Sequence, residues 1–250
     1  MNSTGNTILI TGGGSGIGRG LAEAFHKSGN QVVIAGRRQS ALDEVTAANL
    51  GMKSAVLDIE DPAVIREFAS RTTRDFPALN VVVHNAGIMR PENLLSQPAD
   101  LADAEAMIVT NLLGPIRLTA ALLPLLRRQP RSTIMTVSSG LAFVPMAITP
   151  TYCATKAAVH SYTLSLRHQL KGTTTEVIEI IPPYVQTHLM GAHQAEDPRA
   201  MPLDEYIAEV MSILATQPSV AEVVVGRCKP LRFAAEDGKF DAMFQALNPS

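Results

Sequence analysis

Seven short apolar runs alternate with longer segments of helical periodicity along this chain. The runs have the length of buried strands and lie at 7–11, 31–36, 54–58, 80–87, 132–139, 175–183 and 221–226. Helical patterns lie between them, near 17–28, 40–50, 62–74, 104–128, 152–170 and 203–216. Strands that alternate with helices form parallel sheets covered on both faces, with right-handed crossovers. The sequence therefore predicts an α/β fold around one parallel sheet of seven strands.

Length and composition indicate one domain. The chain has 250 residues, 46% of them hydrophobic, and no repeat or linker divides it, so we expect a single domain over 1–250. The net charge of −2 gives no indication of a nucleic-acid-binding face. One segment, 186–202, reads as a long loop, and such loops are functional or mobile. We predict that it is a substrate lid.

The cysteine count, the N-terminus and the most apolar stretch indicate the cellular compartment and whether the chain spans a membrane. The cysteines, Cys153 and Cys228, are too few for a disulfide framework, although one bridge stays possible. The polar N-terminus shows no signal peptide. The most apolar stretch, 112–126, is interrupted by Arg117 and two prolines and is too short to span a bilayer. We expect a soluble cytoplasmic protein with no membrane partner.

A glycine-rich turn follows the first predicted strand and opens a helix. Glycine allows tight turns and close backbone approach, while a helix N-terminus points N–H groups at an anion. In that context the turn predicts binding of a dinucleotide pyrophosphate. The residues assigned to this contact are Gly12, Ser15, Gly16, Ile17 and Gly18.

The end of the second strand bears on the choice of cofactor. An acidic side chain commonly holds the ribose 2′-hydroxyl there, but this chain has Gly36, Arg37 and Arg38. An arginine fork suits a 2′-phosphate, so the pattern favours NADP over NAD. The alternative is that both arginines are solvated charges at a helix start.

Tyr152 and Lys156 stand four residues apart at the start of a helical segment, which stacks them on one face. A tyrosine with an ordinary pKa near ~10 is too weakly acidic for acid/base work at neutral pH. A neighbouring ammonium would favour the phenolate. The pair is therefore a candidate acid/base device, although such spacing also occurs by chance.

Six motifs follow one another along the chain: Thr11-Gly12-x-x-x-Gly16-x-Gly18, Asp58, Asn85-Ala86-Gly87, Asn111, Ser139 and Tyr152-x-x-x-Lys156. In combination and order, these motifs resemble the short-chain dehydrogenase/reductase family over nearly the whole chain, and segments near Asn85, Tyr152 and Tyr184 are similar to a bacterial DltE-like branch. The resemblance implies a Rossmann-type doubly wound sheet of order 3-2-1-4-5-6-7. It implies hydride transfer between a nicotinamide cofactor and a carbonyl or secondary alcohol. No metal site is expected.

The resemblance also assigns catalytic roles. Tyr152 is the acid/base, and Ser139 binds the reacting oxygen, with Ser138 as the competing candidate. Lys156 holds the nicotinamide ribose and lowers the tyrosine pKa. Asn111 positions a water of the proton relay. Asn111 can also be interpreted as a polar residue whose hydrogen bonds are satisfied at a helix kink, and the two interpretations are compatible.

The cofactor contacts that the family pattern implies are Asp58, Ile59, Asn85, Ala86, Gly87, Val185 and Thr187, beside the residues given above. Two positions depart from the pattern. His84 replaces the first asparagine of Asn-Asn-Ala-Gly, and we interpret it as structural rather than a new base. Pro183 replaces a glycine, so a glycine-specific conformation or N–H donor is lost there.

The segment 140–151, with Tyr184 and Met190, is expected to line the substrate cleft, or else to pack on the core. Its apolar character favours an apolar or neutral small-molecule substrate. Relatives with the same tyrosine and lysine also act as epimerases or dehydratases, and a redox-sensing binder with little turnover is a further alternative. The apolar helices 104–128 and 152–170 predict a homodimer or homotetramer.

Overall fold

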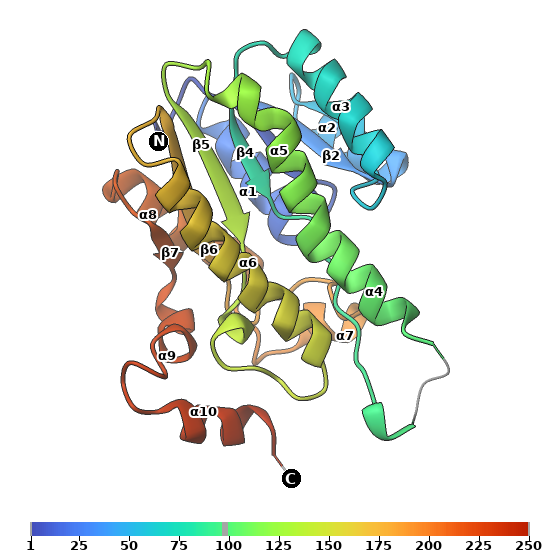
Figure 1. The fold of residues 1–250 in the computed structure, drawn as a ribbon, viewed down its shortest axis with the longest axis vertical. Helices are drawn as coiled ribbons and strands as arrows, with labels where there is room; N and C mark the ends of the chain where they lie inside the picture. Colours follow the sequence, from blue (N-terminus) through green and yellow to red (C-terminus); the bar gives the residue numbers. More distant parts are fainter. Residues whose placement is uncertain (1, 97–99, 250) are drawn as a thin grey trace.

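The parallel sheet has the predicted order. In the computed structural model, which describes residues 2–96 and 100–249, seven parallel strands follow the order β3-β2-β1-β4-β5-β6-β7 (Figure 1). Chain winding reverses between β1 and β4, which places a crevice at the carboxyl ends of these strands. The strands are β1 (Thr7–Thr11), β2 (Gln31–Gly36), β3 (Lys53–Val56), β4 (Leu79–His84), β5 (Ser132–Val137), β6 (Thr175–Ile181) and β7 (Glu222–Val224).

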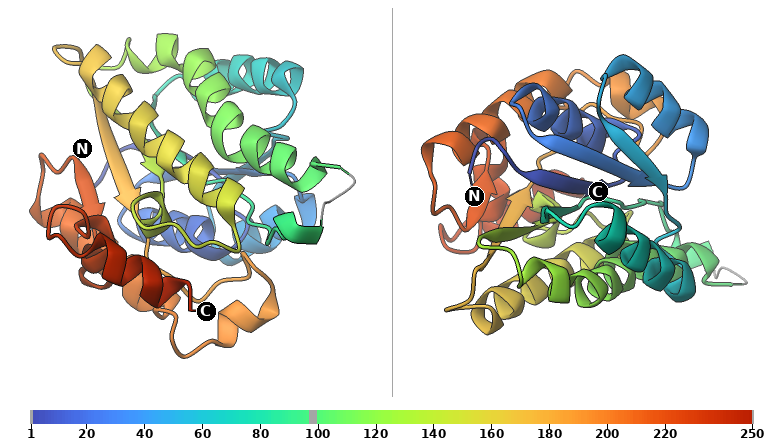
Figure 2. Two further views of the ribbon diagram at one scale, coloured as in Figure 1. Left: turned by 60° about the horizontal axis from the view of Figure 1, so that its bottom comes forward. Right: turned by 90° about the horizontal axis from the view of Figure 1, so that it is seen from above.

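Helices cover both faces of the sheet, so the predicted α/β class is confirmed (Figure 2). One layer contains α1 (Gly16–Lys27), α2 (Gln39–Ala48) and α8 (Leu203–Thr216). The other contains α3 (Pro62–Asp75), α5 (Gly114–Leu126) and α6 (Pro150–Gln169). The remaining α-helices are α4 (Ala102–Ile108), α7 (Ala192–Glu196), α9 (Lys229–Arg232) and α10 (Phe240–Leu247).

The alternation of side chains along β1 builds two separate cores. Ile8 and Ile10 pack with Phe25 and Tyr206 under α1 and α8, whereas Leu9 points to the opposite core with Phe68 of α3. All six side chains are at most 1% exposed. Burial of each large apolar side chain contributes roughly 1.5–3 kcal/mol. The two cores hold the sheet rigidly beneath the crevice.

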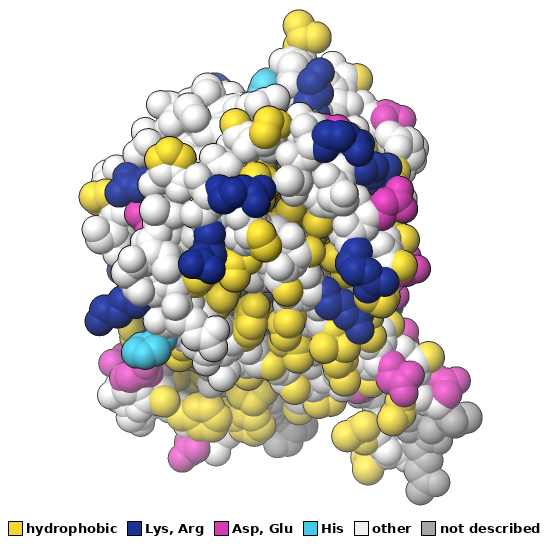
Figure 3. Space-filling model, turned by 45° about the horizontal axis from the view of Figure 1, so that its top comes forward, with side chains coloured by type: hydrophobic (Ala, Val, Ile, Leu, Met, Phe, Trp, Pro, Cys, Tyr) yellow, Lys and Arg dark blue, Asp and Glu magenta, His cyan; other side chains and the backbone are white. Residues whose placement is uncertain are grey.

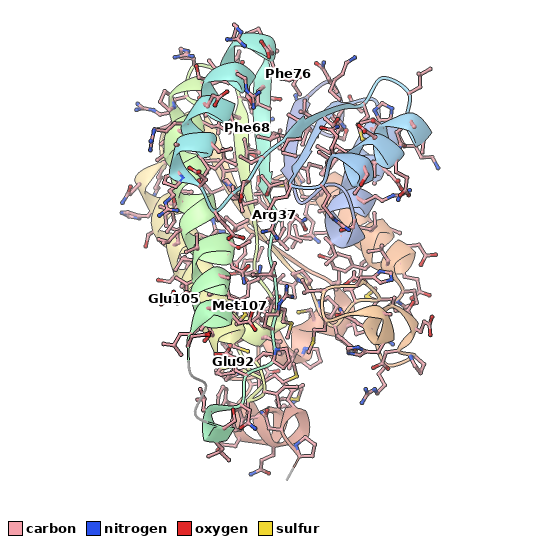
Figure 4. The ribbon with its side chains drawn as sticks, turned by 90° about the vertical axis from the view of Figure 1, so that its right-hand side faces the viewer. Arg37, Phe68, Phe76, Glu92, Glu105 and Met107 are labelled. Atoms are coloured by element: carbon pink, nitrogen blue, oxygen red, sulfur yellow. The ribbon has the colours of Figure 1, made fainter. Side chains whose placement is uncertain are left out.

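The helix predicted at 104–128 is continuous over Ala102–Leu126 but contains a π-helical turn at Val109–Leu113. Figure 4 shows Glu105 and Met107 on opposite sides of α4, and Met107 is fully buried. The 25-residue stretch, with a mean hydropathy of 1.6, is long and apolar enough to cross a membrane by composition. It packs instead on α3, α6 and the sheet, as a core helix does.

Several predicted strands were too long at their carboxyl ends. β4 ends at His84, β5 at Val137 and β6 at Ile181, two or three residues before the predicted ends. The apolar or small residues that follow suggested continued strand, but the chain leaves the sheet there. These excluded residues turn toward the crevice, where the family motifs stand.

The segment predicted as a lid, 186–202, is mostly loop but includes a short helix. It contains α7, and Val185 and Met201 form an isolated parallel bridge. The C-terminal helices α9 and α10 were not predicted. Asn248, just after α10, accepts from Ala147 N (2.6 Å) and donates to Pro145 O (3.1 Å), so the C-terminal segment braces the loop before α6.

Candidate active site

A cavity of about 600 Å³ lies at the carboxyl ends of the strands, a size typical of ligand sites. It brings together thirteen of the predicted site residues: Gly12, Ser15, Gly16, Ile17, Arg38, Asn85, Ala86, Gly87, Ser139, Tyr152, Lys156, Val185 and Thr187. Gly18, Arg37, Asp58, Ile59 and Asn111 do not line it. Asp58 accepts a hydrogen bond from Glu60 N (3.0 Å), and Ile59 packs in the core.

The glycine-rich turn is locked to the segment after β4. The Thr11 hydroxyl accepts from Asn85 N and Ala86 N, both at 3.1 Å, and the Asn85 amide donates to Thr11 O at 3.0 Å. Gly12 has φ +69°, and a Cβ there would lie 2.9 Å from Ala86 Cα. A Cβ at Gly18 would collide with Gly12 O and Asn85 Nδ2. Gly18 therefore serves close packing behind the cavity rather than lining it.

The N-terminus of α1 fits the phosphates of a dinucleotide. Its N-cap, Ser15, makes no side-chain capping bond, and the first turn has no acidic residue. The first N–H groups of α1 and the positive end of its dipole therefore remain for an anion. Gly16, with φ +52°, leaves this approach open opposite Thr187.

The two arginines after β2 have different surroundings. Arg37 Nη1 lies 2.8 Å from Glu60 Oε1, which also accepts from the Thr110 hydroxyl at 2.8 Å. Arg38 lines the cavity and Arg37 does not. Figure 4 shows Arg37 near the middle of the molecule, and its side chain is 53% exposed. The fork assigned to Arg37 by sequence thus already has a carboxylate partner, and Arg38 is the better placed cation.

Tyr152, Ser139 and Lys156 meet on the side of the cavity next to α6. Tyr152 and Lys156 are 6% and 5% exposed, and Lys156 Nζ lies 5.6 Å from the tyrosine ring centroid. Lys156 Nζ donates to Val137 O at 2.8 Å. Two of its three N–H bonds are therefore left for other acceptors.

Burial governs the titration of this pair. It raises the pKa of Tyr152 above its ordinary value, and a hydrogen bond with Ser139 opposes this in part. Burial also lowers the pKa of Lys156 to about 8. The predicted lowering of the tyrosine pKa is thus not seen in the protein alone, because burial disfavours the phenolate more than the Ser139 hydrogen bond favours it.

Ser139, rather than Ser138, is the serine that contacts Tyr152. The Ser139 hydroxyl also accepts from Leu141 N at 3.1 Å, where it caps a short 3-10 helix, Gly140–Ala142. Ser138 is 2% exposed, and its hydroxyl has no partner among the described residues.

Asn111 braces the segment after β4 from behind the cavity. Its amide oxygen accepts from Ile88 N (2.8 Å), and its amide nitrogen donates to Ile88 O (2.9 Å) and the Thr155 hydroxyl (3.2 Å). The π-helical turn aims this side chain, which is 1% exposed. π-Helical turns are frequent at functional sites. The amide holds Gly87 and Ile88 beside Lys156, whose Nζ would lie 3.7 Å from a Cβ at Gly87.

His84 lies in the core rather than in the cavity. Its Nε2 is 2.8 Å from the Thr119 hydroxyl of α5, and the residue is 4% exposed. Burial lowers its pKa to about 4. A neutral imidazole hydrogen-bonded to α5 agrees with the structural interpretation of this position.

The segment after β6 supplies cavity residues that sequence reasoning missed. Gln194 of α7 is 4% exposed and donates to Val185 O (2.8 Å) and the Thr187 hydroxyl (3.1 Å). Pro182, Pro183, His188 and Leu189 also line the cavity. A single glutamine in an apparent loop carries no sequence signal for this role, which depends on the fold of the segment.

The segment after β4 continues past Tyr152 and is fixed to the start of α6. The Glu92 carboxylate accepts from Thr151 N (2.9 Å) and from the Thr151 hydroxyl (2.8 Å). Glu92 N donates to Ile148 O at 2.8 Å. Met89, on the same segment, packs with Tyr152 in an apolar cluster. Glu92 was not predicted, since an isolated acid in a loop carries no sequence signal.

Outside the cavity, the structure gathers His160, Glu179 and Glu222 near α9. His160 Nδ1 lies 2.8 Å from Glu179 Oε2, and Arg232 donates to both oxygens of Glu222, at 2.7 and 3.1 Å. The Arg232 guanidinium also lies 4.5 Å from the Phe143 ring centroid. Because Arg232 supplies the positive charge, we interpret the group as an ion-pair network that holds α9 against the loop after β5.

Comparison with known proteins decides the family. The family model described as short chain dehydrogenase matches residues 6–198. The chain belongs to the short-chain dehydrogenases. The oxidoreductase DltE of Bacillus subtilis is 36% identical over 251 residues, covering 99% of this chain and 98% of that protein. The predicted family, and with it an NAD(P)-dependent dehydrogenase or reductase, are confirmed.

Solved structures agree with this short-chain dehydrogenase fold. One from Burkholderia cenocepacia, in complex with NADP, has a TM-score of 0.82 at 23% identity and covers 99% of each chain. The closed form of a serine dehydrogenase complexed with NADP+ has a TM-score of 0.76 at 28% identity, over 86% of this chain and 91% of that one.

Proposed function

We propose that this short-chain dehydrogenase transfers a hydride between NADP(H) and a carbonyl or secondary alcohol, with Tyr152 as the acid/base. The observation that carries the proposal is the meeting of Tyr152, Ser139 and Lys156 in the cavity that begins at the N-terminus of α1. One end of the cavity can bind phosphates, and the other holds a proton donor.

Each residue of the site has its own role in the proposed reaction. Ser139 orients the carbonyl oxygen, and Tyr152 gives its phenolic proton to that oxygen during reduction or takes it back during oxidation. The cofactor, when bound, supplies or accepts the hydride. Lys156, fixed by Val137 O, binds the ribose with its other N–H groups. Asn111 holds Ile88 and Thr155 in place next to Lys156 through hydrogen bonds, and it takes part in the proton relay.

The preference for NADP over NAD rests on Arg38. A guanidinium in the cavity next to the end of β2 suits a ribose phosphate, with Arg37 as a second contributor. Gly36 supplies no acidic partner for a ribose hydroxyl. The serine dehydrogenase structure at 28% identity holds NADP+, which supports the same choice.

The substrate body next to the reacting carbon is apolar or neutral. Leu141, Met146, Leu189 and Met190 pack around the cluster that contains Tyr152. Two of the four side chains are methionines, which adapt to ligands of different shape. The segment 186–202 carries Thr187, His188, Leu189 and Gln194 into the cavity lining and acts as the lid.

The enzyme is a cytoplasmic homodimer or homotetramer built on α5 and α6. Figure 3 shows hydrophobic side chains gathered over the face of these helices. Leu112, Leu113, Ile116 and Leu123 are half-buried, and Leu164 is 44% exposed. Leu126 is fully buried and lies outside this face. Light scattering of the wild type and of Leu164→Glu measures the oligomeric state. An oligomeric wild type that Leu164→Glu dissociates is expected, and a monomeric wild type would contradict the proposed interface.

The reaction itself is tested with purified protein, NADPH and a panel of ketones and aldehydes. The expected result is oxidation of NADPH, followed by its absorbance, and formation of the matching alcohol. A panel of secondary alcohols with NADP+ tests the reverse direction. Absence of turnover in both panels, with NADPH bound, would contradict the proposed function and favour a sensor.

A further inference from the structure

The lining of the cavity is cationic. Among the described residues that line it, none is Asp or Glu, whereas Arg38, Arg90 and Lys156 are present, and His188 is a further polar residue of the lining. Arg38 and Lys156 already have roles toward the proposed cofactor. Arg90 and His188 are left without a role, and both belong to segments that reach the reacting end of the cavity.

Arg90 stands on the segment that runs past Tyr152. Two residues earlier, Ile88 is bonded to Asn111; one residue earlier, Met89 packs in the Tyr152 cluster. Two residues later, Glu92 is bonded to Thr151. The segment is thus fixed on both sides of Arg90, and its backbone holds this arginine beside the acid/base.

The Arg90 guanidinium is only weakly engaged. Its Nε lies 3.9 Å from Asp103 Oδ1, and the Asp103 side chain is 70% exposed. Such a surface pair contributes little. Its Nη1 donates to Met89 O at 3.2 Å, which leaves most of the five N–H groups for a ligand. Glu92, the nearest acid along the chain, is turned to Thr151 instead.

We propose that Arg90 recognises a carboxylate on the substrate, so that the enzyme acts on a carbonyl or alcohol with an apolar body and an anionic end. The inference rests on the proposed function, and His188, which also lines the cavity, adds a further donor. The arginine fork matches the two oxygens of a carboxylate. The apolar cluster takes the body of the substrate, and Arg90 takes the charged end.

The test compares two ligands of nearly equal shape and different charge. Hexanoate and hexanamide are titrated calorimetrically into the protein in the presence of NADP+. We expect hexanoate to bind about ten- to hundredfold more tightly, as for charge-assisted hydrogen bonds. The preference is expected to shrink with salt, since Arg90 is half-exposed. Equal affinities for hexanoate and hexanamide would overturn the proposal. Tighter binding of hexyl phosphate than of hexanoate would also overturn it, because the site would then recognise a phosphate rather than a carboxylate.

Variants assign the effect to one side chain. Arg90→Met is expected to bring the ratio of the two dissociation constants close to one, and Arg90→Lys to restore part of it. Arg71→Met is the matched control, because Arg71 on α3 has the same 3.9 Å distance to a carboxylate, on Glu67, and a 48% exposed side chain. It is expected to keep the wild-type ratio. An unchanged ratio in Arg90→Met would overturn the proposal, as would weaker NADPH binding, which would assign Arg90 to the cofactor.

A second arm separates this inference from the reaction. Reduction of 4-oxopentanoate and of its methyl ester is followed with NADPH. Turnover of both at equal kcat/KM, with no preference for hexanoate, would refute the carboxylate site and leave the dehydrogenase intact. A carboxylate preference in calorimetry that needs Arg90, without turnover of any carbonyl, would support the site and refute the reaction.

Discussion

The Glu92 carboxylate receives both the backbone N–H and the hydroxyl of Thr151, at 2.9 and 2.8 Å, one residue before Tyr152. This contact joins the segment after β4 to the first turn of α6. It satisfies an N–H that has no partner within the helix and places a negative charge at the positive end of the helix dipole. The position of Tyr152 in the cavity therefore depends on a residue sixty positions earlier in the chain.

Glu92→Ala is expected to lower the free energy of unfolding by about 1 kcal/mol, as for other capping contacts. It is expected to reduce kcat about tenfold, because small misplacements of an acid/base are costly. Glu92→Gln keeps an oxygen for Thr151 N and should recover part of both losses. Urea denaturation and steady-state kinetics measure these effects. Glu105→Ala, on the exposed side of α4, is the control (Figure 4), and an equal effect there would refute the positioning role.

The lowered pKa of Lys156, to about 8, makes stability depend on pH. Between pH 8 and the ordinary lysine pKa, the unfolded chain binds more protons than the native protein, so stability rises with pH from this group. The free energy of unfolding of the wild type, relative to that of Lys156→Met, should therefore increase by roughly 2 kcal/mol between about pH 8 and about pH 10. The Tyr152 contribution is present in both proteins. A pH-independent difference in urea denaturation would show that Lys156 is not desolvated.

His84 gives the opposite test in acid. Burial lowers its pKa to about 4, so the unfolded chain takes up a proton near pH 6.5 that the native protein does not. As the pH falls from about 7 to about 4.5, the free energy of unfolding of the wild type should decrease by roughly 2 kcal/mol relative to that of His84→Asn. If His84 instead served as a base, its variant would shift the pH–rate profile.

Arg38 is expected to contribute more to the cofactor preference than Arg37. Arg38→Ala should weaken NADPH binding about ten- to hundredfold, whereas Arg37→Ala should do less because Glu60 already holds it. NADH binding should change little in either. A Cβ at Gly36 would meet only Leu42, at 3.6 Å, so Gly36→Asp fits and should reverse the preference. Fluorescence titration of NADPH and NADH measures each step, and equal wild-type affinities would refute the assignment.

The sequence predicted what depends on local pattern. Apolar runs located β1 through β7, and fixed spacing placed Tyr152 and Lys156 on one face of α6. Strand ends were misjudged after His84, Val137 and Ile181. The residues that follow β5 and β6, Ser138, Ser139 and Pro182, are as buried as the strands, and those after β4 are still half-buried, so the apolar pattern does not mark where the chain leaves the sheet.

Contacts between distant segments were beyond the sequence. The partner of Arg37 is Glu60, and the partner of Thr151 is Glu92; both pairings require the order of the sheet. The direction of the Tyr152 pKa was also misjudged, since desolvation depends on what covers the residue and not on its spacing from Lys156. Gln194 and Arg90 gained meaning only once the cavity brought their segments together.

The Tyr152→Phe variant tests the central claim most directly. It removes the transferable proton and leaves the packing of the ring nearly unchanged, so cofactor binding should persist while turnover falls at least ~10²-fold. Lys156→Ala should weaken both, because Lys156 also binds the ribose. The decisive measurement is the single-turnover rate of NADPH oxidation with a carbonyl that the wild type reduces. A loss of at least ~10²-fold with an unchanged NADPH dissociation constant is predicted, and a near-normal rate would contradict the mechanism.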